Sequence, residues 1–224
     1  MNKTIIEVKG LYKFYKAGEN IVHALDGLDF TINKGEFVAI VGPSGSGKST
    51  LLNMLAGLEK PTKGEIIIGG THLEKLKENQ LVAFRRNNVG FIFQSYNLLP
   101  TMNALDNVAL PLVFRGMDNK KRIEIAKQYL TLVGLEKQMY QNGNAMSGGQ
   151  QQRVGIARAL AMQPKIIFAD EPTGNLDTKT TAEVLELMKQ IVKEEDQTLI
   201  MVTHDVDIAN VADRQIKIVD GKAV

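Results

Sequence analysis

The sequence of 224 residues contains no cysteine. A disulfide framework and a thiolate-bound metal are therefore both excluded, which is compatible with a reducing compartment. The sequence also has no apolar run that approaches the roughly 18 residues of a membrane span. Its first ten residues hold too few apolar side chains for a signal peptide. If this chain serves transport across a membrane, we expect another chain to supply the channel.

A strong charge of one sign is missing as well. Lys and Arg total 27 and Asp and Glu total 25, so the net charge at neutral pH is +2. Proteins that bind nucleic acid generally are more basic than this, and we expect no nucleic-acid partner, although a local basic patch stays compatible. The length suits one large domain or a core with a subdomain.

Short apolar runs alternate with helical patterns along the chain. Continuous apolar runs indicate strands that are buried on both faces, as in a parallel sheet. Such strands are predicted at Phe37–Val41, Ile166–Ala169 and Leu199–Thr203. Helices are predicted to follow them at about Lys48–Ala56, Thr178–Glu194 and Val206–Ala212. This alternation predicts an α/β fold with crossover helices.

Two stretches differ from this pattern. Residues 1–36 alternate around a turn near Ala17-Gly18-Glu19-Asn20, which predicts antiparallel strands, and Glu65–Ile68 is expected to join them. Residues from about Gln94 to Ala161 have a mostly helical pattern, broken at Pro100, Pro111 and Gly116. We therefore expect one domain over residues 1–224. Its α/β core and antiparallel β subdomain would occupy about residues 1–93 and 162–224, and an inserted α-helical subdomain about residues 94–161.

Residues 42–49 fit the pattern G-x-x-x-x-G-K-[ST] between a predicted strand and a predicted helix. Glycines let successive N–H groups face an anion, and the helix start adds partial positive charge. Lys48 is expected to reach the β- and γ-phosphates, Ser49 to ligate Mg²⁺ and Thr50 to add a hydroxyl. The other expected ATP-binding residues are Gly42, Pro43, Ser44, Gly45, Ser46 and Gly47. The motif alone predicts nucleotide binding and does not name the reaction.

Two acidic residues follow the predicted strand Ile166–Ala169. A carboxylate at the end of a buried strand is costly unless a cation meets it, and in P-loop NTPases an acid in this place holds Mg²⁺. We therefore predict Asp170 as a metal-binding residue. Glu171, one residue further on, is predicted to be the general base that polarises the attacking water.

A second loop resembles the signature motif of the ABC ATPase family. Residues 147–153 read Ser-Gly-Gly-Gln-Gln-Gln-Arg and open a predicted helix at Val154–Ala161, so they form a second potential anion site. Met146 stands where leucine is usual, which is a volume-conserving change. The resemblance covers essentially the whole chain and implies a P-loop NTPase core with a signature-bearing helical subdomain.

The resemblance also implies how two chains share ATP. In this family two copies pair head to tail, so Ser147, Gly148, Gly149 and Gln150 of one chain are expected to contact the nucleotide in the phosphate loop of the other. A homodimer that encloses ATP and Mg²⁺ is therefore implied. In the Asn175-Leu176-Asp177 run, Asp177 resembles the family's D-loop residue at that interface.

Three more positions match the family in the expected order. Gln94 resembles the glutamine that senses Mg²⁺ and the membrane partner, and His204 resembles the switch histidine that contacts the γ-phosphate. Tyr15 resembles the aromatic residue that stacks on adenine, with Tyr12 as a rival. His23 and His72 match no motif, and we interpret both as ordinary structural residues.

Within the family, the chain resembles the MacB, LolD and FtsE group. The matching runs are residues 35–40, 89–94 and 169–177. This resemblance implies an ATP-hydrolysing subunit at the cytoplasmic face of the plasma membrane. Its partner would be a separate FtsX- or MacB-like permease, working in export or in extrusion of lipoproteins or peptides. An FtsE-like signalling ATPase, an importer ATPase and a soluble ABC protein on ribosomes or DNA stay open. The importer alternative is less favoured, because few residues follow the predicted strand Gln215–Val219.

Two apolar segments allow two interpretations. Residues 98–100, Leu-Leu-Pro, and residues 108–114 could belong to the core or could line a groove for a helix of a partner.

Overall fold

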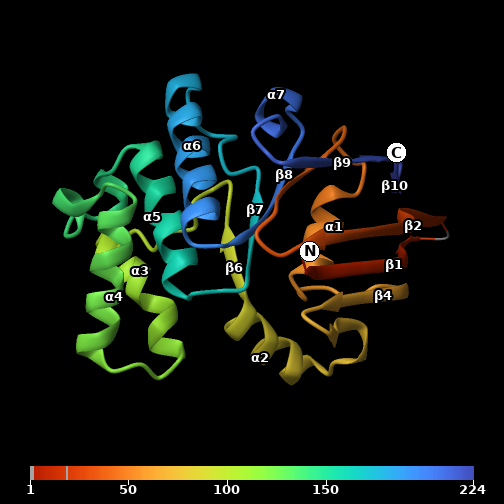
Figure 1. The fold of residues 1–224 in the computed structure, drawn as a ribbon, viewed down its shortest axis with the longest axis horizontal. Coiled ribbons are helices and arrows are strands. Elements are labelled where there is room, and N and C mark those ends of the chain that lie inside the picture. Colours follow the sequence, from red (N-terminus) through yellow and green to blue (C-terminus); the bar gives the residue numbers. More distant parts are fainter. Residues whose placement is uncertain (1–2, 19) are drawn as a thin grey trace. The chain divides into compact units, whose positions relative to one another are not determined.

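The computed structural model describes residues 3–18 and 20–224 (Figure 1). The chain divides into two compact units, one formed by Met1–Arg85 with Ile191–Val224 and the other by Arg86–Gln190. The turn predicted at Ala17-Gly18-Glu19-Asn20 includes Glu19, which lies outside the described residues. The limits predicted for the helical subdomain stay a prediction.

The first unit contains the parallel strands that the apolar runs predict. Their order is β10-β9-β3-β8, and β3 is parallel to both of its neighbours. Every residue of β3 and β8 is buried, which explains why these strands show no alternation. A turn at Asp220 and Gly221 leads from β9 into β10. The bounds are Phe37–Val41 for β3, Thr198–Thr203 for β8, Arg214–Val219 for β9 and Lys222–Ala223 for β10.

A separate antiparallel sheet in the same unit has the order β2-β1-β4-β5. Its strands alternate between buried and exposed residues; in β4, for example, Ile66 and Ile68 are buried whereas Glu65 and Ile67 are partly exposed. This confirms the antiparallel strands predicted before residue 36 and the addition of residues 65–68. The bounds are Thr4–Ala17 for β1, Asn20–Asn33 for β2, Lys63–Ile68 for β4 and Thr71–His72 for β5.

Helix α1 (Lys48–Leu55) packs against β2 and β8 in the first unit. Helix α7 (Val206–Ala209) is shorter than predicted, because the sequence pattern extended it to Ala212. The chain must leave the helix early to reach β9. Its last step is fixed by Asp213, whose N–H donates to the carbonyl of Phe37 at 2.8 Å and whose carboxylate accepts from the N–H of Phe37 at 2.9 Å.

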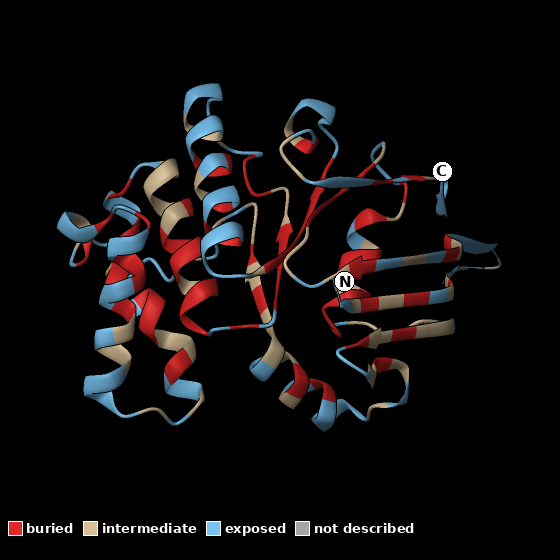
Figure 2. Cartoon of the chain, viewed as in Figure 1, coloured by how far each residue is buried: buried red, intermediate tan, exposed pale blue. Residues whose placement is uncertain are grey.

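The second unit combines two parallel strands with three mutually packed helices. The strands are β6 (Val89–Ile92) and β7 (Ile166–Asp170). The helices are α3 (Ala104–Phe114), α4 (Asn119–Leu132) and α5 (Gly148–Ala161). Apolar residues of α5 form a continuous buried stretch from Val154 to Ala157 (Figure 2). Helix α2 (Glu78–Asn88) leads into this unit and α6 (Thr178–Glu194) leads out of it. Single 3-10 turns occur at Leu73–Lys75 (η1), Glu136–Gln138 (η2) and Gly143–Ala145 (η3).

Pro111 does not break the helical pattern as predicted but lies inside α3. Proline removes one backbone hydrogen bond and crowds the preceding turn, which usually interrupts a helix. Here Val108 and Leu112 on either side of Pro111 are fully buried. Their burial offsets the lost bond, and the helix continues to Phe114.

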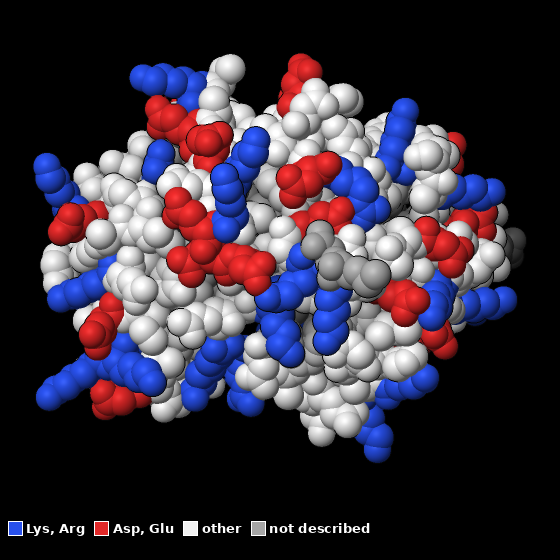
Figure 3. Space-filling model, viewed as in Figure 1, with Lys and Arg blue, Asp and Glu red and all other residues white. Residues whose placement is uncertain are grey.

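The drawn face of the surface carries charges of both signs. On the face drawn in Figure 3, Lys and Arg side chains are interspersed with Asp and Glu side chains. Within residues 3–18 and 20–224, every helix is too short or too polar to cross a bilayer.

Asn107 should contribute more to stability than Asn103, the N-cap of α3. Its side chain is 1% exposed, accepts from the N–H of Leu99, and donates to the carbonyls of Leu99, Met102 and Asn103. Asn107→Ala should lower the free energy of unfolding by about 3 kcal/mol, because it removes four hydrogen bonds made by a buried side chain. Asn103→Ala removes an exposed cap and should cost about 1 kcal/mol. Urea denaturation measures both, and equal losses would contradict the assignment.

Candidate functional site

Residues 42–50 connect β3 to α1 with the geometry of a phosphate-binding loop. The buried strand β3 fixes the start of the loop. Helix α1 begins at Lys48 and has Gly47 as its N-cap, with a φ of 99°. The N–H groups of a first helical turn have no partner within the helix and carry partial positive charge. This end of α1 therefore favours an anion.

Two glycines of the loop lie where no side chain fits. A Cβ atom at Gly42 would lie 2.0 Å from the carbonyl oxygen of Ile218 in β9. A Cβ atom at Gly47 would lie 2.3 Å from the carbonyl oxygen of Ala24 in β2. Both separations are far shorter than van der Waals contact. The loop is therefore held between two strands by backbone contacts that only glycine permits.

Two polar side chains of the loop are buried. Lys48 is 6% exposed, and its ammonium donates to the carbonyl of Pro43 at 2.7 Å. Ser46 is 3% exposed, and among the described residues its hydroxyl oxygen meets no hydrogen-bond partner. Leaving a buried hydroxyl unpaired costs about 1–3 kcal/mol. A phosphate oxygen would accept from this hydroxyl, so the loop fits a bound phosphate.

Tyr15 on β1 is tied to the loop's helix through its hydroxyl. The hydroxyl donates to a carboxylate oxygen of Glu59 at 2.7 Å. The pKa of Tyr15 is raised, first because burial disfavours the phenolate and second because of the bond to Glu59, while a hydrogen bond with Thr50 in α1 lowers it. The ammonium of Lys13 lies 5.1 Å from the centre of the ring, above it. The ring, 38% exposed, is therefore fixed beside the phosphate-binding helix.

Tyr12 has a different environment. Its hydroxyl would lie 2.9 Å from a Cβ atom at Gly27, and its ring centroid is 5.9 Å from that of Phe14. The ring thus packs within the β1–β2 hairpin. This supports Tyr15 rather than Tyr12 as the adenine contact.

His204 directly follows β8 and is exposed. Strand β8 is parallel to β3, and Val41 pairs with Thr203. The phosphate loop and His204 therefore leave the carboxyl ends of adjacent strands, where α/β proteins place their ligands. Asp205 then caps α7 by accepting from the N–H groups of residues 207 and 208.

In the second unit, Gln94, Asp170 and Glu171 lie at the carboxyl ends of two parallel strands, with Asp170 as the last residue of β7. Ile92 pairs with Ala169, so β6 and β7 bring these three residues to the same edge of their sheet. Glu171 has a φ of 42°, a left-handed conformation that costs a non-glycine residue about 1–2 kcal/mol. Strain of this kind is concentrated at functional sites.

The residues after Glu171 lie close to Gln94. The side-chain amide of Asn175 donates to the carbonyl of Gln94 at 3.0 Å, and a Cβ atom at Gly174 would lie 2.7 Å from the amide nitrogen of Gln94. The predicted metal-sensing glutamine and the predicted interface loop are therefore in direct contact. A shift of either one would displace the other.

The signature loop opens α5 with a capping box. The Ser147 hydroxyl accepts from the N–H of Gln150, and the Gln150 side chain accepts from the N–H of Ser147. Cβ atoms at Gly148 and Gly149 would lie 2.8 Å from the Tyr96 hydroxyl and 2.4 Å from a methyl carbon of Thr180. A side chain at either position would force Tyr96 or Thr180 to move, and the two glycines leave the backbone N–H groups of the helix start uncovered by side chains of their own.

Asp177 has a structural role in the described residues. Its carboxylate accepts from the N–H groups of Lys179 and Thr180 and from the Thr180 hydroxyl at the start of α6. The hydroxyl bond, followed by the backbone bonds, holds the pKa of Asp177 below its usual value. The cap orients the loop that precedes α6, so it is compatible with the predicted interface role.

Two residues that the sequence motifs do not indicate belong to these sites. The Glu59 carboxylate accepts the hydrogen bond from the Tyr15 hydroxyl. Arg158 in α5 is partly buried, its pKa is lowered by that burial, and its guanidinium donates to the carbonyl of Tyr96 at 2.8 Å and to that of Asn97. Tyr96 and Asn97 both have positive φ, so Arg158 stabilises a strained loop after Gln94. No local pattern relates positions so far apart in the sequence.

The apolar segments near residues 98–114 divide between the two interpretations. Val108 and Leu112 are fully buried and belong to the core. Leu99, Val113 and Phe114 are 42%, 42% and 72% exposed. A groove for a partner helix stays a prediction, and these exposed side chains are its candidates.

Comparison with known proteins gives consistent matches over nearly the whole chain. The family model described as ABC transporter matches residues 25–174. The lipoprotein-releasing system ATP-binding protein LolD of Rickettsia conorii is 45% identical over 97% of this chain and 96% of its own length. The macrolide export ATP-binding/permease protein MacB of Rhodopirellula baltica is 44% identical over 97% of this chain but only 32% of its own length. The solved ATP-binding cassette MJ0796 of Methanocaldococcus jannaschii, described as a dimer after hydrolysis with bound ADP and Pi, has a TM-score of 0.89. It is 43% identical and covers 98% of this chain and 96% of its own.

The choice between Tyr15 and Tyr12 can be tested by ATP affinity. Tyr15→Ala should raise the Kd for ATP about tenfold, because a ring stack contributes about 0.5–1.5 kcal/mol. Tyr15→Phe keeps the ring and should change the Kd much less. Tyr12→Ala is the matched control and should leave the affinity near its original value. Fluorescent ATP-analogue titration measures all three variants, and a larger effect at Tyr12 would reverse the assignment.

Proposed function

The chain belongs to the ABC transporter family, whose ATP-binding subunits hydrolyse ATP, and we propose that two copies of it enclose MgATP to drive a separate permease. The observation that carries this proposal is the presence of two glycine-bearing helix starts in one chain, at Lys48 and at Gly148. Each offers backbone N–H groups to an anion. One nucleotide per chain needs only one phosphate loop, so the second serves the nucleotide of another copy.

In the proposed cycle, the first loop binds the nucleotide. The backbone N–H groups of residues 44–49 surround the phosphates, and Lys48 exchanges its bond to Pro43 for the β- and γ-phosphate oxygens. The buried Ser46 hydroxyl gains an acceptor. Tyr15 stacks on the adenine, held by Glu59 and Thr50. The proposal is supported by the burial of Lys48 and Ser46, because buried polar groups need partners.

We assign Mg²⁺ to oxygen donors of three side chains. The Ser49 hydroxyl, the Gln94 amide oxygen and the Asp170 carboxylate are hard ligands of the kind that Mg²⁺ prefers. The set contains no nitrogen or sulfur donor, so its chemistry suits this ion. When bound, Mg²⁺ neutralises charge on the phosphate oxygens.

Hydrolysis is assigned to Glu171 and His204. The Glu171 carboxylate accepts a proton from water while the water oxygen forms a bond to the γ-phosphorus. The bond between the γ-phosphorus and the β,γ-bridging oxygen breaks, and its electron pair leaves with ADP. His204 holds the γ-phosphate, and Ser147 with Gly148 and Gly149 of the other copy stabilise its charge. Loss of the γ-phosphate removes the shared ligand, so the dimer opens.

Glu171→Gln should separate ATP binding from ATP hydrolysis. The amide cannot accept the proton, so turnover should fall at least about a hundredfold, while ATP binding persists and traps a closed dimer. Gel filtration with ATP and measurement of phosphate release test both points. Lys48→Ala should instead lose ATP binding and remain monomeric. Glu186→Gln, at an exposed carboxylate of α6, is the matched control. Normal turnover in Glu171→Gln would show that another group is the base.

For the partner, we propose a separate integral membrane permease of the FtsX or MacB type, which this chain would contact at the cytoplasmic face of the membrane. The similarity to LolD and MacB supports export or extrusion of lipoproteins or peptides as the work performed. The exposed apolar side chains Leu99, Val113 and Phe114 are candidates for contact with a cytoplasmic helix of that permease.

Co-purification from membranes tests this partner. The full chain should capture one integral membrane protein with a large extracytoplasmic domain, and Phe114→Asp should weaken the capture at least about tenfold because it places a charge in the contact. Lys120→Asp, an exposed charge change on α4, is the control. A permease without such a domain would support the importer alternative. Capture of a cell-wall hydrolase complex without transport would support the signalling alternative.

A further inference from the structure

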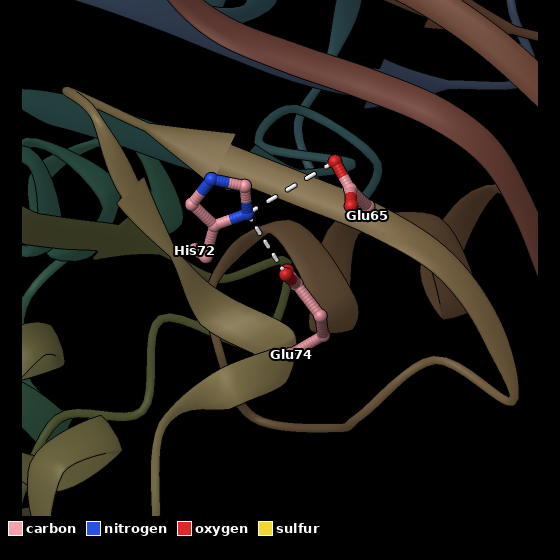
Figure 4. Close-up of side chains that lie close together, drawn as sticks. All are labelled: Glu65, His72 and Glu74. Atoms are coloured by element: carbon pink, nitrogen blue, oxygen red, sulfur yellow. Dashed lines mark hydrogen bonds and ion pairs between the residues drawn. The ribbon is translucent and has the colours of Figure 1, made fainter.

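Three metal-ligating side chains converge on the β4–β5 hairpin, and none of them belongs to a nucleotide motif. Glu65 lies on β4, His72 ends β5, and Glu74 lies in η1. Each offers one ligand atom, and these atoms all lie within 4.8 Å of one another. Figure 4 shows both carboxylates directed at the same edge of the imidazole ring.

The hairpin register brings these residues together. Ile67 pairs with His72 and Ile68 pairs with Thr71. Alternate residues of a strand share a face, so Glu65 and Ile67 lie on the partly exposed face of β4 and His72 joins them from the opposite strand. The following turn returns Glu74 to the same place. The backbone, rather than chance side-chain rotation, therefore sets the cluster.

Glu74 is held in the orientation that a ligand needs. One carboxylate oxygen accepts from the N–H of Ile66 at 3.2 Å, and the other lies 2.9 Å from Nδ1 of His72. The side chain is only 16% exposed. Hydrogen bonds that fix a ligating carboxylate in this way are typical of metal sites.

Two carboxylates face the same ring nitrogen of His72, and one proton on that nitrogen can bond to only one of them. Nδ1 of His72 is 2.9 Å from Glu74 and 4.0 Å from Glu65. An imidazole nitrogen carries at most one proton, which can bond to one carboxylate and leaves the other facing the ring without a donor. Two ammonium groups lie near the cluster: Lys75 is 3.9 Å from Glu74, and Lys9, which pairs with Glu7, is the β1 register partner of Glu65 and is attracted to it. Both lysine side chains are more than half exposed, at 65% and 53%, so solvent screens this attraction.

We propose that Glu65, His72 and Glu74 bind a divalent transition-metal ion of the Zn²⁺ class. A tetrahedral Zn²⁺ with bonds of about 2.0–2.2 Å holds its donor atoms about 3.3–3.6 Å apart, and the two distances to Nδ1, 2.9 Å and 4.0 Å, lie on either side of this range. Imidazole nitrogen favours Zn²⁺, Ni²⁺ or Cu²⁺ over Mg²⁺ and Ca²⁺. Water takes the fourth position.

The site has a structural consequence for the edge of the sheet. β5 has two residues and is the edge strand of the order β2-β1-β4-β5. Two ladder pairs hold such a strand weakly. A metal bound by β4, β5 and η1 fastens it, and the fold gains stability by mass action as the ion binds the folded state.

Zn²⁺ titration of tag-free, chelator-stripped, nucleotide-free protein tests the proposal. Calorimetry in excess Mg²⁺ should give one Zn²⁺ per chain. His72→Ala should raise the Kd at least about tenfold, and so should Glu74→Gln, which keeps an acceptor oxygen for the N–H of Ile66. His23→Ala is the matched control, because it removes a histidine of the same unit that faces no carboxylate within 4.0 Å among the described residues. Co²⁺ should give the visible absorption of a tetrahedral site in the original protein and in His23→Ala only.

The outcomes are separable from misfolding. In His72→Ala, the melting temperature of the metal-free protein and the affinity for MgATP should both be unchanged. Glu65→Gln changes a ligand that is more exposed, with 43% of its side chain accessible. Equal Zn²⁺ affinity in His72→Ala and His23→Ala overturns the proposal, as does the lack of a saturable site in the original protein. Neither result affects the nucleotide site, because the two share no residue.

Discussion

The phosphate loop can exist in this fold only because its backbone passes within contact distance of two neighbouring strands. Positions 42 and 47 would carry Cβ atoms 2.0 Å and 2.3 Å from carbonyl oxygens of β9 and β2. These two strands belong to different sheets of the first unit. The loop therefore joins the parallel and the antiparallel sheet, and any side chain at these glycines would push them apart. The N–H of Gly221, which donates to the carbonyl of Ser46, closes the same junction.

The same constraint acts in the second unit. Side chains at Gly148 and Gly149 would crowd Tyr96 and Thr180. The side chains of Ser147 and Gln150 each accept a hydrogen bond from the backbone N–H of the other residue. Close packing and capping together expose the helix start while keeping it rigid. A backbone anion site needs both properties, because a frayed turn would lose the alignment of its N–H groups.

Much of the fold could be predicted from the sequence because the informative patterns are local. Strand β3 and helix α6 have the predicted bounds, since a continuous apolar run and a long amphipathic repeat fix their limits. Local propensity opposes a helix at Pro111 and predicts a break there, whereas the burial of Val108 and Leu112 lets the helix continue. The end of α7 depends on Asp213 bonding to Phe37 in another strand, and no local pattern contains that contact.

The candidate site also contains residues that local motifs predict and residues that only the folded chain brings together. The phosphate loop, Asp170, Glu171 and the signature loop stand in contiguous motifs, so their positions can be predicted even though their roles are still to be tested. Glu59 and Arg158 act through hydrogen bonds to residues 44 and 62 positions away. Only the folded chain shows that Glu59 orients Tyr15 and that Arg158 holds the loop after Gln94.

His72 shows why a residue without a motif can still have a site. The sequence places Glu65 and Glu74 seven positions before and two positions after it, which is no familiar spacing for a metal. The hairpin register, rather than the spacing, brings the three side chains to one face. The two kinds of site also differ in what holds the ligand. Anions are met by backbone dipoles at helix starts, where side chains must be absent, whereas a cation needs lone pairs that only side chains on a fixed strand pair supply. A fold that separates helix starts from an exposed sheet edge can therefore carry both without competition between them.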